Sequence, residues 1–440
     1  MVAKVPPNFR RVITAAAGGN VIEWYDFYIF GSLAVSVLAV KFFEKGHPSA
    51  ALITTVGIFT AGFLIRPLGA FLFGWLGDRV GRKYTFLLTL MGMAVGTGAI
   101  GLVPTFDTIG ISAAVILLAL RMIQGLCLGG QYGGAITYVA EHVVDEHRGY
   151  YTGWLQTSPT LGIVLSLAVI IATRTYFGND VFNDWAWRIP FLFSFLLLFI
   201  AGYVRSQFEE SPVYAEIKAK GQTSTNPWRE AFLNPANLKY VVIASIVVLG
   251  QGVVWYSGQF WALYYLQTVS KVDVLHSAYI VGAGLLLGTP SLIFFGWLSD
   301  NIGRKPVILG GMLIAAVTYY PLYTWLGAAT QPNDINYPVA IIIVAIMVCY
   351  VGMVYGPIGA FLAEFFPARI RYTSVSVPYH IGNGWGGGLV PVITVAAYQA
   401  TSSLGYALIY PIAVPAVCFL LGLLLMPETR QNKIWETSTA

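Results

Sequence analysis

The chain has 440 residues, of which 57% are hydrophobic and only 10% charged, and its mean hydropathy is +0.69. Soluble domains carry about a quarter charged residues, so this composition excludes an ordinary soluble protein and indicates several membrane-spanning helices. The net charge of +5 does not indicate nucleic-acid binding, because most basic residues follow the topological pattern described below. Cys127, Cys349 and Cys418 lie in apolar stretches without metal-ligand spacing, so we expect neither a disulfide nor a metal site.

Apolar stretches of the length that crosses a bilayer, about 20 residues, recur along the whole chain. Three of them contain internal charges, and the last is long enough for two helices that separate near residues 401–405. The predicted spans are residues 12–40, 49–77, 84–106, 108–140, 149–173, 185–204, 240–270, 277–299, 306–333, 335–363 and two within 372–427. Twelve spans place both termini on the same side of the membrane.

The basic residues are divided unevenly between the two sides of the membrane. Of the 25 Lys and Arg residues, 18 lie in the tails and in the connections after even-numbered spans, 5 lie on the other side and 2 lie inside spans. Cytoplasmic loops carry an excess of Lys and Arg. The sequence therefore predicts that both termini are cytoplasmic.

One ten-residue segment occurs twice. The first copy, GWLGDRVGRK, begins at Gly74, and the second, GWLSDNIGRK, begins at Gly296, 222 residues later, with seven of ten positions identical. An offset of half the chain predicts two pseudo-symmetric six-helix bundles in parallel orientation, residues 1–207 and 240–440. The polar residues 208–239 between them are predicted to form a cytoplasmic linker without a folded domain.

Several motifs together resemble those of the major facilitator superfamily. The repeated segment is similar to the superfamily signature between spans two and three, and RMIQG (121–125) and PETR (427–430) belong to the same pattern. The segments that resemble its metabolite:proton symporters are GNVIEWYDFYIFG, IRPLGAFLFGWLGDRVGRK, GGQYGGAITYVAEH, WRIPF and EFFPARIRYTSVSVPYHIGNGWGGGLVP, between residues 19 and 388.

The resemblance implies an all-α protein with the major facilitator fold, embedded in a bacterial-type plasma membrane. It implies proton symport of organic acids, shikimate, or proline and betaine, and no enzymatic activity. One position departs from the pattern, because many members carry glutamate where this chain has Gln131. A coupling role for a carboxylate at this position therefore cannot be transferred.

Four charged side chains lie inside the predicted spans: Glu23, Asp26, Arg66 and Arg121. Each costs at least about 2.5–3.5 kcal/mol at the bilayer centre, so we expect them to face a polar cavity and to offset one another. Glu23 and Asp26 share one helix face, where mutual repulsion favours protonation of one of them, whereas a nearby arginine favours the charged form. We expect Asp26 to be the proton-coupled acid, with Glu23 second. A purely structural salt-bridge network remains the alternative.

Arginines near mid-membrane favour an anionic substrate, because a guanidinium binds a carboxylate in a fixed, bidentate geometry. The sequence therefore predicts import of a small mono- or dicarboxylate with a proton by alternating access, and a zwitterionic osmolyte such as proline or betaine is the alternative. The predicted substrate-binding residues are Arg66, Arg121, Tyr25, Gln131, Tyr256, Gln259, Tyr379, His380 and Asn383. Ordinary helix packing is an alternative role for the polar and aromatic residues of the C-terminal bundle.

Charged residues at the cytoplasmic helix ends are predicted to form a gate that closes and opens as the bundles rock. Aspartates there can cap a helix N-terminus, and arginines can pair with glutamates across the closed gate. The predicted gating residues are Asp78, Arg79, Arg82, Glu141, Asp300, Arg304 and Glu364. Positive-inside topology is a simpler and compatible explanation of the basic residues.

We expect a monomer that needs no cofactor besides the proton gradient. A drug antiporter is disfavoured, because only Pro159 and Gly162 remain of the glycine- and proline-rich pattern typical of span five in such proteins. A non-transporting sensor is also disfavoured, because it would normally need a large soluble domain, and the longest polar stretch is the linker.

Overall fold

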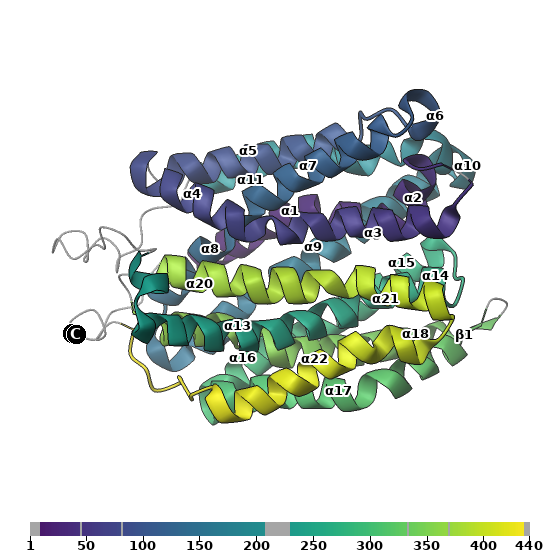
Figure 1. The fold of residues 1–440 in the computed structure, drawn as a ribbon. Coiled ribbons are helices and arrows are strands. Elements are labelled where there is room, and N and C mark those ends of the chain that lie inside the picture. The colour runs from purple at the N-terminus through teal and green to yellow at the C-terminus, as the bar shows by residue number, and fades with distance from the viewer. Residues whose placement is uncertain are drawn as a thin grey trace.

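The computed structural model describes residues 9–44, 46–80, 82–206, 229–331, 334–367 and 370–434. Helices that run roughly parallel to one another make up almost all of it (Figure 1), and the strands found in these ranges form one antiparallel pair, with Thr330 opposite Ile335. Nine helical segments of the described chain are long and apolar enough to cross a membrane, and Leu88–Ile100 and Arg188–Ile200 are shorter apolar helices. The prediction of an all-α membrane fold is confirmed.

The first half of the described chain, residues 9–206, is coloured purple to blue in Figure 1. Its helices are α1 (Phe9–Leu33), η1 (Ala34–Leu38), α2 (Ala39–Lys41), α3 (Pro48–Leu64), α4 (Arg66–Val80), α5 (Arg82–Ile100), α6 (Phe106–Ile109), α7 (Ser112–Gly129), α8 (Tyr132–His142), η2 (Asp145–His147), α9 (Arg148–Phe177), α10 (Asn179–Val181), η3 (Phe182–Ala186) and α11 (Arg188–Ser206).

The second half, residues 229–434, is coloured teal to yellow and lies beside the first. Its elements are η4 (Arg229–Leu233), α13 (Pro235–Tyr256), η5 (Ser257–Trp261), α14 (Ala262–Thr268), α15 (Val274–Gly288), α16 (Pro290–Ile302), α17 (Arg304–Ala329), β1 (Thr330–Gln331), β2 (Asp334–Ile335), α18 (Tyr337–Tyr355), α19 (Ile358–Phe365), α20 (Arg371–Tyr379), η6 (His380–Gly387), α21 (Gly388–Thr401) and α22 (Leu404–Leu425). Residues 207–228 of the predicted linker lie outside the described ranges. Helix α13 begins at Pro235, before the predicted start at residue 240.

Several predicted spans consist of two helices rather than one. The break between α3 and α4 falls at Ile65, just before Pro67, and that between α15 and α16 falls at Thr289, just before Pro290. Proline lacks the N–H that would continue the helical hydrogen bonds. Helices α7 and α8 separate at Gly130 and Gln131. Apolar length predicts a span but not such a break within it.

The two halves use the same pattern of helix packing. In the first half α1 packs on α9 and α5 on α11, and in the second α13 packs on η6 and α17 on α22. Between the halves, α9 packs on α15 and α16, while α21 packs on α3 and α20 packs on α4 and α8. Among the functional candidates, Arg66, Glu141, Asp300 and Tyr379 lie on or beside helices that form this contact between the halves.

Candidate functional site

Arg66 lies at the break between α3 and α4, with its side chain fully buried. The guanidinium carbon lies 4.3 Å from the ring centres of Phe27 and Phe63 and 5.3 Å from that of Trp24, which gives cation–π contacts. None of its three nitrogen atoms makes a hydrogen bond of regular geometry, although the Tyr256 hydroxyl is close enough to interact with the guanidinium. The N–H donors of this guanidinium are therefore available to an anion.

This arginine differs from the other arginines buried in the described chain. The others, namely Arg121, Arg148, Arg174, Arg304 and Arg371, each donate hydrogen bonds to a carboxylate, a side-chain amide or a backbone carbonyl. A buried, charged donor without a partner is costly. A ligand that supplies the missing acceptor would compensate this cost.

Arg121 has a different environment, although it lies near Arg66. Its Nε donates to the backbone oxygen of Phe59 (3.3 Å), and its Nη1 donates to the backbone oxygen of Phe27 (2.9 Å) and to Gln124 Oε1 (2.8 Å). The Phe27 ring also covers the guanidinium, with its centre 3.5 Å from the guanidinium carbon. These contacts join α7 to α1 and α3, so the geometry favours a structural role over the predicted substrate-binding one.

Asp26 is fully buried on the face of α1 that meets α5 and α11. The Thr97 hydroxyl donates to the backbone oxygen of Asp26 (3.0 Å), and Ser194 of α11 lies beside the carboxyl group. Neither carboxyl oxygen of Asp26 nor the Ser194 hydroxyl has a hydrogen-bond partner. An ionised carboxylate would be uncompensated here, so the geometry suits the neutral, protonated acid.

Glu23 is buried one turn before Asp26 and interacts with it electrostatically. In the part of the chain that the structure describes, no ion pair joins either acid to Arg66 or Arg121. The expectation that the charges pair with one another is therefore wrong for Asp26 in this conformation. Instead, two arginines share the rings of Phe27 and Phe63, and Asp26 faces α11.

Polar side chains of the second half approach Arg66 from across the interface. His380 and Asn383 lie on η6, Gln251 on α13 and Gln259 on η5, and all four are buried. Both side-chain polar atoms of each glutamine, both ring nitrogens of His380 and Asn383 Oδ1 have no hydrogen-bond partner. His380 is close enough to interact electrostatically with Arg66. His380 therefore lies beside Arg66, and the other three residues provide unused amide groups on nearby segments of the second half.

Aromatic rings from both halves complete this group, which we call the central site. Tyr28 stacks on Trp255 with ring centres 5.4 Å apart, and its hydroxyl lies 3.4 Å from that of Tyr256. Tyr132 stacks on Tyr379 across the interface at 3.3 Å. Tyr256 and Tyr379 were predicted to bind substrate, whereas Tyr28, Tyr132 and Trp255 were not. The sequence shows that these residues lie in segments rich in aromatic residues. It does not show which of the rings face the other half of the protein.

Two residues predicted to bind substrate lie outside the central site. The Tyr25 hydroxyl donates to the backbone oxygen of Pro190 (2.5 Å), and its ring packs edge-on against Phe193 of α11. Gln131 Nε2 donates to the Thr89 hydroxyl (3.1 Å) on α5. Both side chains contact other helices of the first half, so their geometry favours packing roles.

Buried ion pairs join the halves at the end where α9, α17 and α20 begin, which we call the network end. Glu364 accepts hydrogen bonds from Arg148 of the first half and from Arg304, each at 2.9 Å. Arg371 of the second half donates to Glu141 of the first half at 2.9 Å. Three predicted gating residues thus lie in this network. Arg148 and Arg371 also belong to this network, although they were not predicted as gating residues.

Asp300 links the same network to the N-terminus of α9 in the other half. Its two carboxylate oxygens accept from the backbone N–H groups of Gly149 (2.8 Å) and Tyr150 (2.7 Å), and Oδ1 also accepts from Arg304 (2.7 Å). This is a charge-assisted helix cap made between halves. The side chains of the corresponding first-half residues, Asp78, Arg79 and Arg82, lie outside the described residues.

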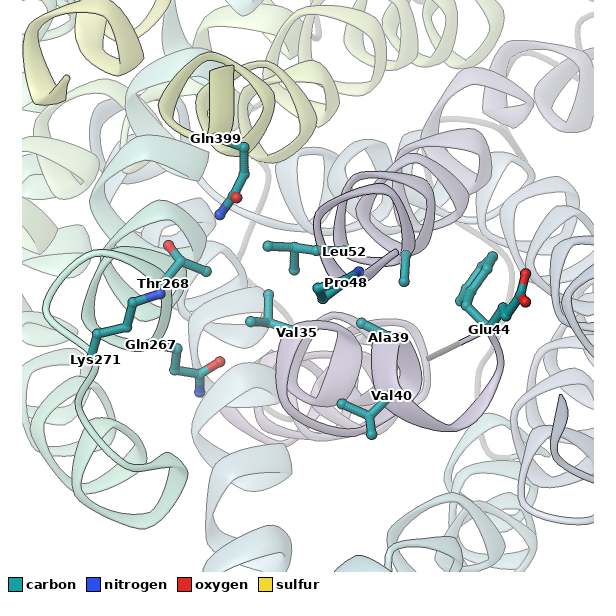
Figure 2. Close-up of a pocket in the computed structure, with 12 residues that line it drawn as sticks. Val35, Ala39, Val40, Glu44, Pro48, Leu52, Gln267, Thr268, Lys271 and Gln399 are labelled. Atoms are coloured by element: carbon teal, nitrogen blue, oxygen red, sulfur yellow. The ribbon is translucent and has the colours of Figure 1, made fainter. Parts of the chain in front are cut away.

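At the opposite end, which we call the cavity end, the two halves line a partly open cavity of about 310 Å³ (Figure 2). Val35 and Leu52 line it from the first half, and Gln267, Lys271 and Gln399 line it from the second. Figure 2 shows Gln267, Thr268, Lys271 and Gln399 on the second-half side, with Val35 and Leu52 facing them and Glu44 at the far edge of the first-half side.

Direct contacts between halves also close the cavity end. The Tyr264 hydroxyl donates to the backbone oxygen of Gly31 (2.8 Å), and Thr60 Oγ1 donates to the backbone oxygen of Gly388 (2.9 Å). Ser49 donates to Gln399 (3.0 Å) at the surface. Because ion pairs join the halves at the network end as well, the central site is enclosed from both directions.

A helical membrane protein that encloses buried, unpaired polar groups between two halves has the architecture of a solute transporter. A sequence model of the Major Facilitator Superfamily matches residues 16–391 and 290–439, and the chain belongs to this family. Its fold and its relatives are those of multi-pass transporters of the cell membrane and not of enzymes. The family that the sequence motifs resemble is therefore confirmed.

Curated relatives cover nearly the whole chain. The chain is 32% identical to the inner membrane metabolite transport protein YhjE of Escherichia coli K12, over 98% of the chain and 97% of the relative. It is 32% identical to the proline/betaine transporter of the same organism, over 97% and 85%. It is 30% identical to the citrate-proton symporter of Salmonella typhi, over 88% and 87%.

A solved structure confirms the fold. The proton:xylose symporter XylE, bound to 6-bromo-6-deoxy-D-glucose, superposes with a TM-score of 0.78 over 99% of both chains. Because the two sequences are only 16% identical, this similarity concerns the arrangement of the helices alone.

Proposed function

We propose that this protein is a proton-coupled symporter that imports a small organic carboxylate by alternating access. The observation that carries the proposal is the fully buried guanidinium of Arg66, whose nitrogens have no partner although it lies between the two halves. A carboxylate would supply the missing acceptors in a bidentate geometry. The name of the citrate-proton symporter, a relative at 30% identity, gives independent support.

The proposed topology has twelve spans in two six-helix bundles, residues 1–207 and 240–440, with both termini in the cytoplasm. The repeated segments and the matching helix pairs of the two halves support the duplication. The uneven distribution of basic residues supports the orientation, which places the network end in the cytoplasm. We propose that a monomer suffices, because both halves of the central site come from one chain.

Asp26 is the proposed proton carrier. A buried carboxyl group without a hydrogen bond or a counter-charge is held in its neutral form while the site is closed, and it can release the proton once water reaches it. Glu23 remains the second candidate. Binding of a proton on α1 and of an anion on α4 would then accompany closure around the substrate.

Alternating access follows from the two closures. At the network end the ion pairs of Glu364 and Glu141 would break when the site opens to the cytoplasm. At the cavity end the contacts of Tyr264 and Thr60 would break when it opens outward. Each set can re-form while the other is open, because the two sets share no residue.

A zwitterionic osmolyte is the second candidate substrate. Tyr28, Trp255 and Tyr256 present aromatic faces in the central site, and such faces bind quaternary ammonium groups. The name of the proline/betaine transporter, a relative at 32% identity, supports the same possibility. The unused donors of Arg66 in the central site favour the carboxylate substrate.

The proposal is tested with purified protein in proteoliposomes. Labelled organic acids should accumulate against their gradient only when the outside is more acidic than the inside. Asp26→Asn should abolish this accumulation but retain counterflow, since exchange of bound substrate needs no net proton movement. Asp184→Asn replaces an exposed acid on η3. This variant is the matched control and should transport normally. Full accumulation by Asp26→Asn would contradict the assignment, and Glu23→Gln would then be the next variant.

A further inference from the structure

We infer that the substrate carries one carboxylate and an otherwise uncharged body, an inference that rests on the proposed function. The central site offers one cation whose hydrogen-bonding capacity is unused. Of the arginines buried in the described chain, Arg66 alone donates no hydrogen bond. One carboxylate would satisfy this guanidinium.

A second carboxylate would find no second guanidinium whose donors are all unused. Arg121 already donates from Nε and Nη1, which leaves only its Nη2 without a hydrogen-bond partner, and the ring of Phe27 lies 3.5 Å from its guanidinium carbon. The remaining buried arginines bind acceptors at the two ends of the molecule, away from the central site. The second carboxylate of a dicarboxylate would therefore meet at most one nitrogen of an arginine that already binds protein acceptors, which compensates its burial poorly.

The second half supplies groups that suit an uncharged body. Gln251, Gln259 and Asn383 offer amide groups with unused donors or acceptors, which can bind a hydroxyl or carbonyl oxygen. Trp255 and Tyr256 offer ring faces to carbon atoms. A small hydroxy-, keto- or aryl-monocarboxylate fits this chemistry.

A zwitterion fits less well, because its cationic group would be enclosed with Arg66. Asp26 cannot compensate for it, since its carboxyl group faces α11 and not the central site. The rings of Trp24, Phe27 and Phe63 are already covered by the Arg66 guanidinium. Like charges enclosed at low dielectric repel strongly.

One further consequence is that transport should be electroneutral. Protonation of Asp26 adds one positive charge and binding of a monocarboxylate to Arg66 adds one negative charge, whatever the states of the other buried groups. The occluded, loaded protein then has the same net charge as the empty one. Uptake should respond to a pH gradient and not to the membrane potential.

The test compares three classes of solute in proteoliposomes with a fixed pH gradient. The monocarboxylates are lactate, pyruvate and benzoate, the polycarboxylates are succinate and citrate, and the zwitterions are glycine betaine and proline. We expect monocarboxylates to compete for uptake about tenfold or more better than either other class. We also expect a potassium diffusion potential set with valinomycin to leave the initial rate unchanged.

The outcomes separate this inference from the proposed function. Preference for succinate or citrate, or a rate that follows the potential, would overturn the monocarboxylate inference and leave proton–carboxylate symport intact. Preference for betaine or proline would overturn both. Accumulation that ignores the pH gradient for every acid would overturn the proposed function instead.

A gain-of-function variant tests directly whether the number of available cations in the central site limits the number of carboxylates on the substrate. His380→Arg adds a second guanidinium near Arg66, so succinate should protect this variant from thermal unfolding at a concentration about tenfold or more below that needed for the natural protein. Asn383→Lys, on the same helical segment η6, is a second variant in case the first does not fold. If both fold and neither gains affinity for succinate, the inference is wrong.

Discussion

At the scale of single residues, the two arginines in the membrane show how environment assigns different roles to one side chain. Arg121 donates to two backbone carbonyls and to Gln124, which joins three helices. Arg66 contacts only ring faces with its guanidinium and keeps its donors unused. A guanidinium whose donors have no acceptor is suited to binding a ligand, whereas one that donates from two of its three nitrogens to protein acceptors is suited to joining helices.

Replacing each arginine with lysine should therefore have opposite consequences. Arg66→Lys keeps the charge and loses the bidentate geometry, so the KM for the carboxylate should rise about tenfold, while the melting temperature in detergent changes little. Arg121→Lys leaves backbone carbonyls without donors, at a cost of about 1–3 kcal/mol each, so it should lower the melting temperature. Uptake kinetics and thermal unfolding of both variants check this. A large KM effect from Arg121→Lys with unchanged stability would contradict the assignment.

At the scale of helices, acidic residues fix helix N-termini that meet at the network end. Asp300 caps α9 from the other half, and Glu428 of the PETR segment accepts from the backbone N–H groups of Arg304 (2.9 Å) and Lys305 (3.1 Å) at the start of α17. Carboxylates there also interact favourably with the helix dipole. The cap of α9 exists only while the halves are together, so it acts as part of the gate.

Glycines allow α9 and α16 to approach closely enough for this cap. A methyl group on Gly153 of α9 would lie 3.1 Å from the backbone oxygen of Leu292 on α16, which is tighter than ordinary contact. Small residues at helix crossings permit such backbone contact in membranes. The glycine and the aspartate together explain why α9 and α16 form the main crossing between halves.

Asp300→Asn should weaken the closed network end. The amide has one acceptor oxygen in place of two and no charge, so it loses one backbone hydrogen bond and the ion pair with Arg304. We expect a cysteine introduced at the buried Thr152 to react several-fold faster with a maleimide in detergent when Asp300→Asn is also present. Asp184→Asn is the matched control and should leave the labelling rate unchanged. Equal rates for the Asp300 variant would show that the cap does not hold the gate.

At the scale of the whole molecule, the conformation is closed at both ends. The network end is held by charged pairs and the cavity end by hydroxyl–backbone contacts and the surface contact between Ser49 and Gln399. Charged pairs gain strength in a dry interface, whereas hydroxyl contacts exchange easily with water. Enclosure of the central site between two such closures is the intermediate that alternating access requires.

Covalent closure of either end should stop transport. We expect cysteines at Ser49 and Gln399 to be joined by a short bifunctional methanethiosulfonate reagent, and cysteines at Glu141 and Arg371 to be joined likewise, in a background with Cys127, Cys349 and Cys418 replaced. Each linked pair should abolish uptake, and reduction should restore it for the Ser49–Gln399 pair. Each single cysteine variant is the control. Normal uptake with the Ser49–Gln399 link in place would mean that this end need not open.

Much of this architecture could be predicted from the sequence, because solvation in lipid depends on composition and local order. Apolar length predicted the all-α membrane fold, and the repeated segment with its partner motifs indicated the family. The separation predicted near residues 401–405 is found, since α21 ends at Thr401 and α22 begins at Leu404. The rule that charges in a membrane must be buried in protein held for all four.

What only the tertiary structure decided is which buried groups meet. The sequence determined that two acids and two arginines would lie inside the membrane, and pairing between them was the simplest expectation. The direction of each side chain on its helix, and the helix that packs there, instead set Asp26 toward α11, engaged Arg121 with backbone carbonyls and left Arg66 facing the second half. Pairing depends on distances of a few ångströms between helices far apart in the chain, and those distances arise from packing, which local sequence does not encode.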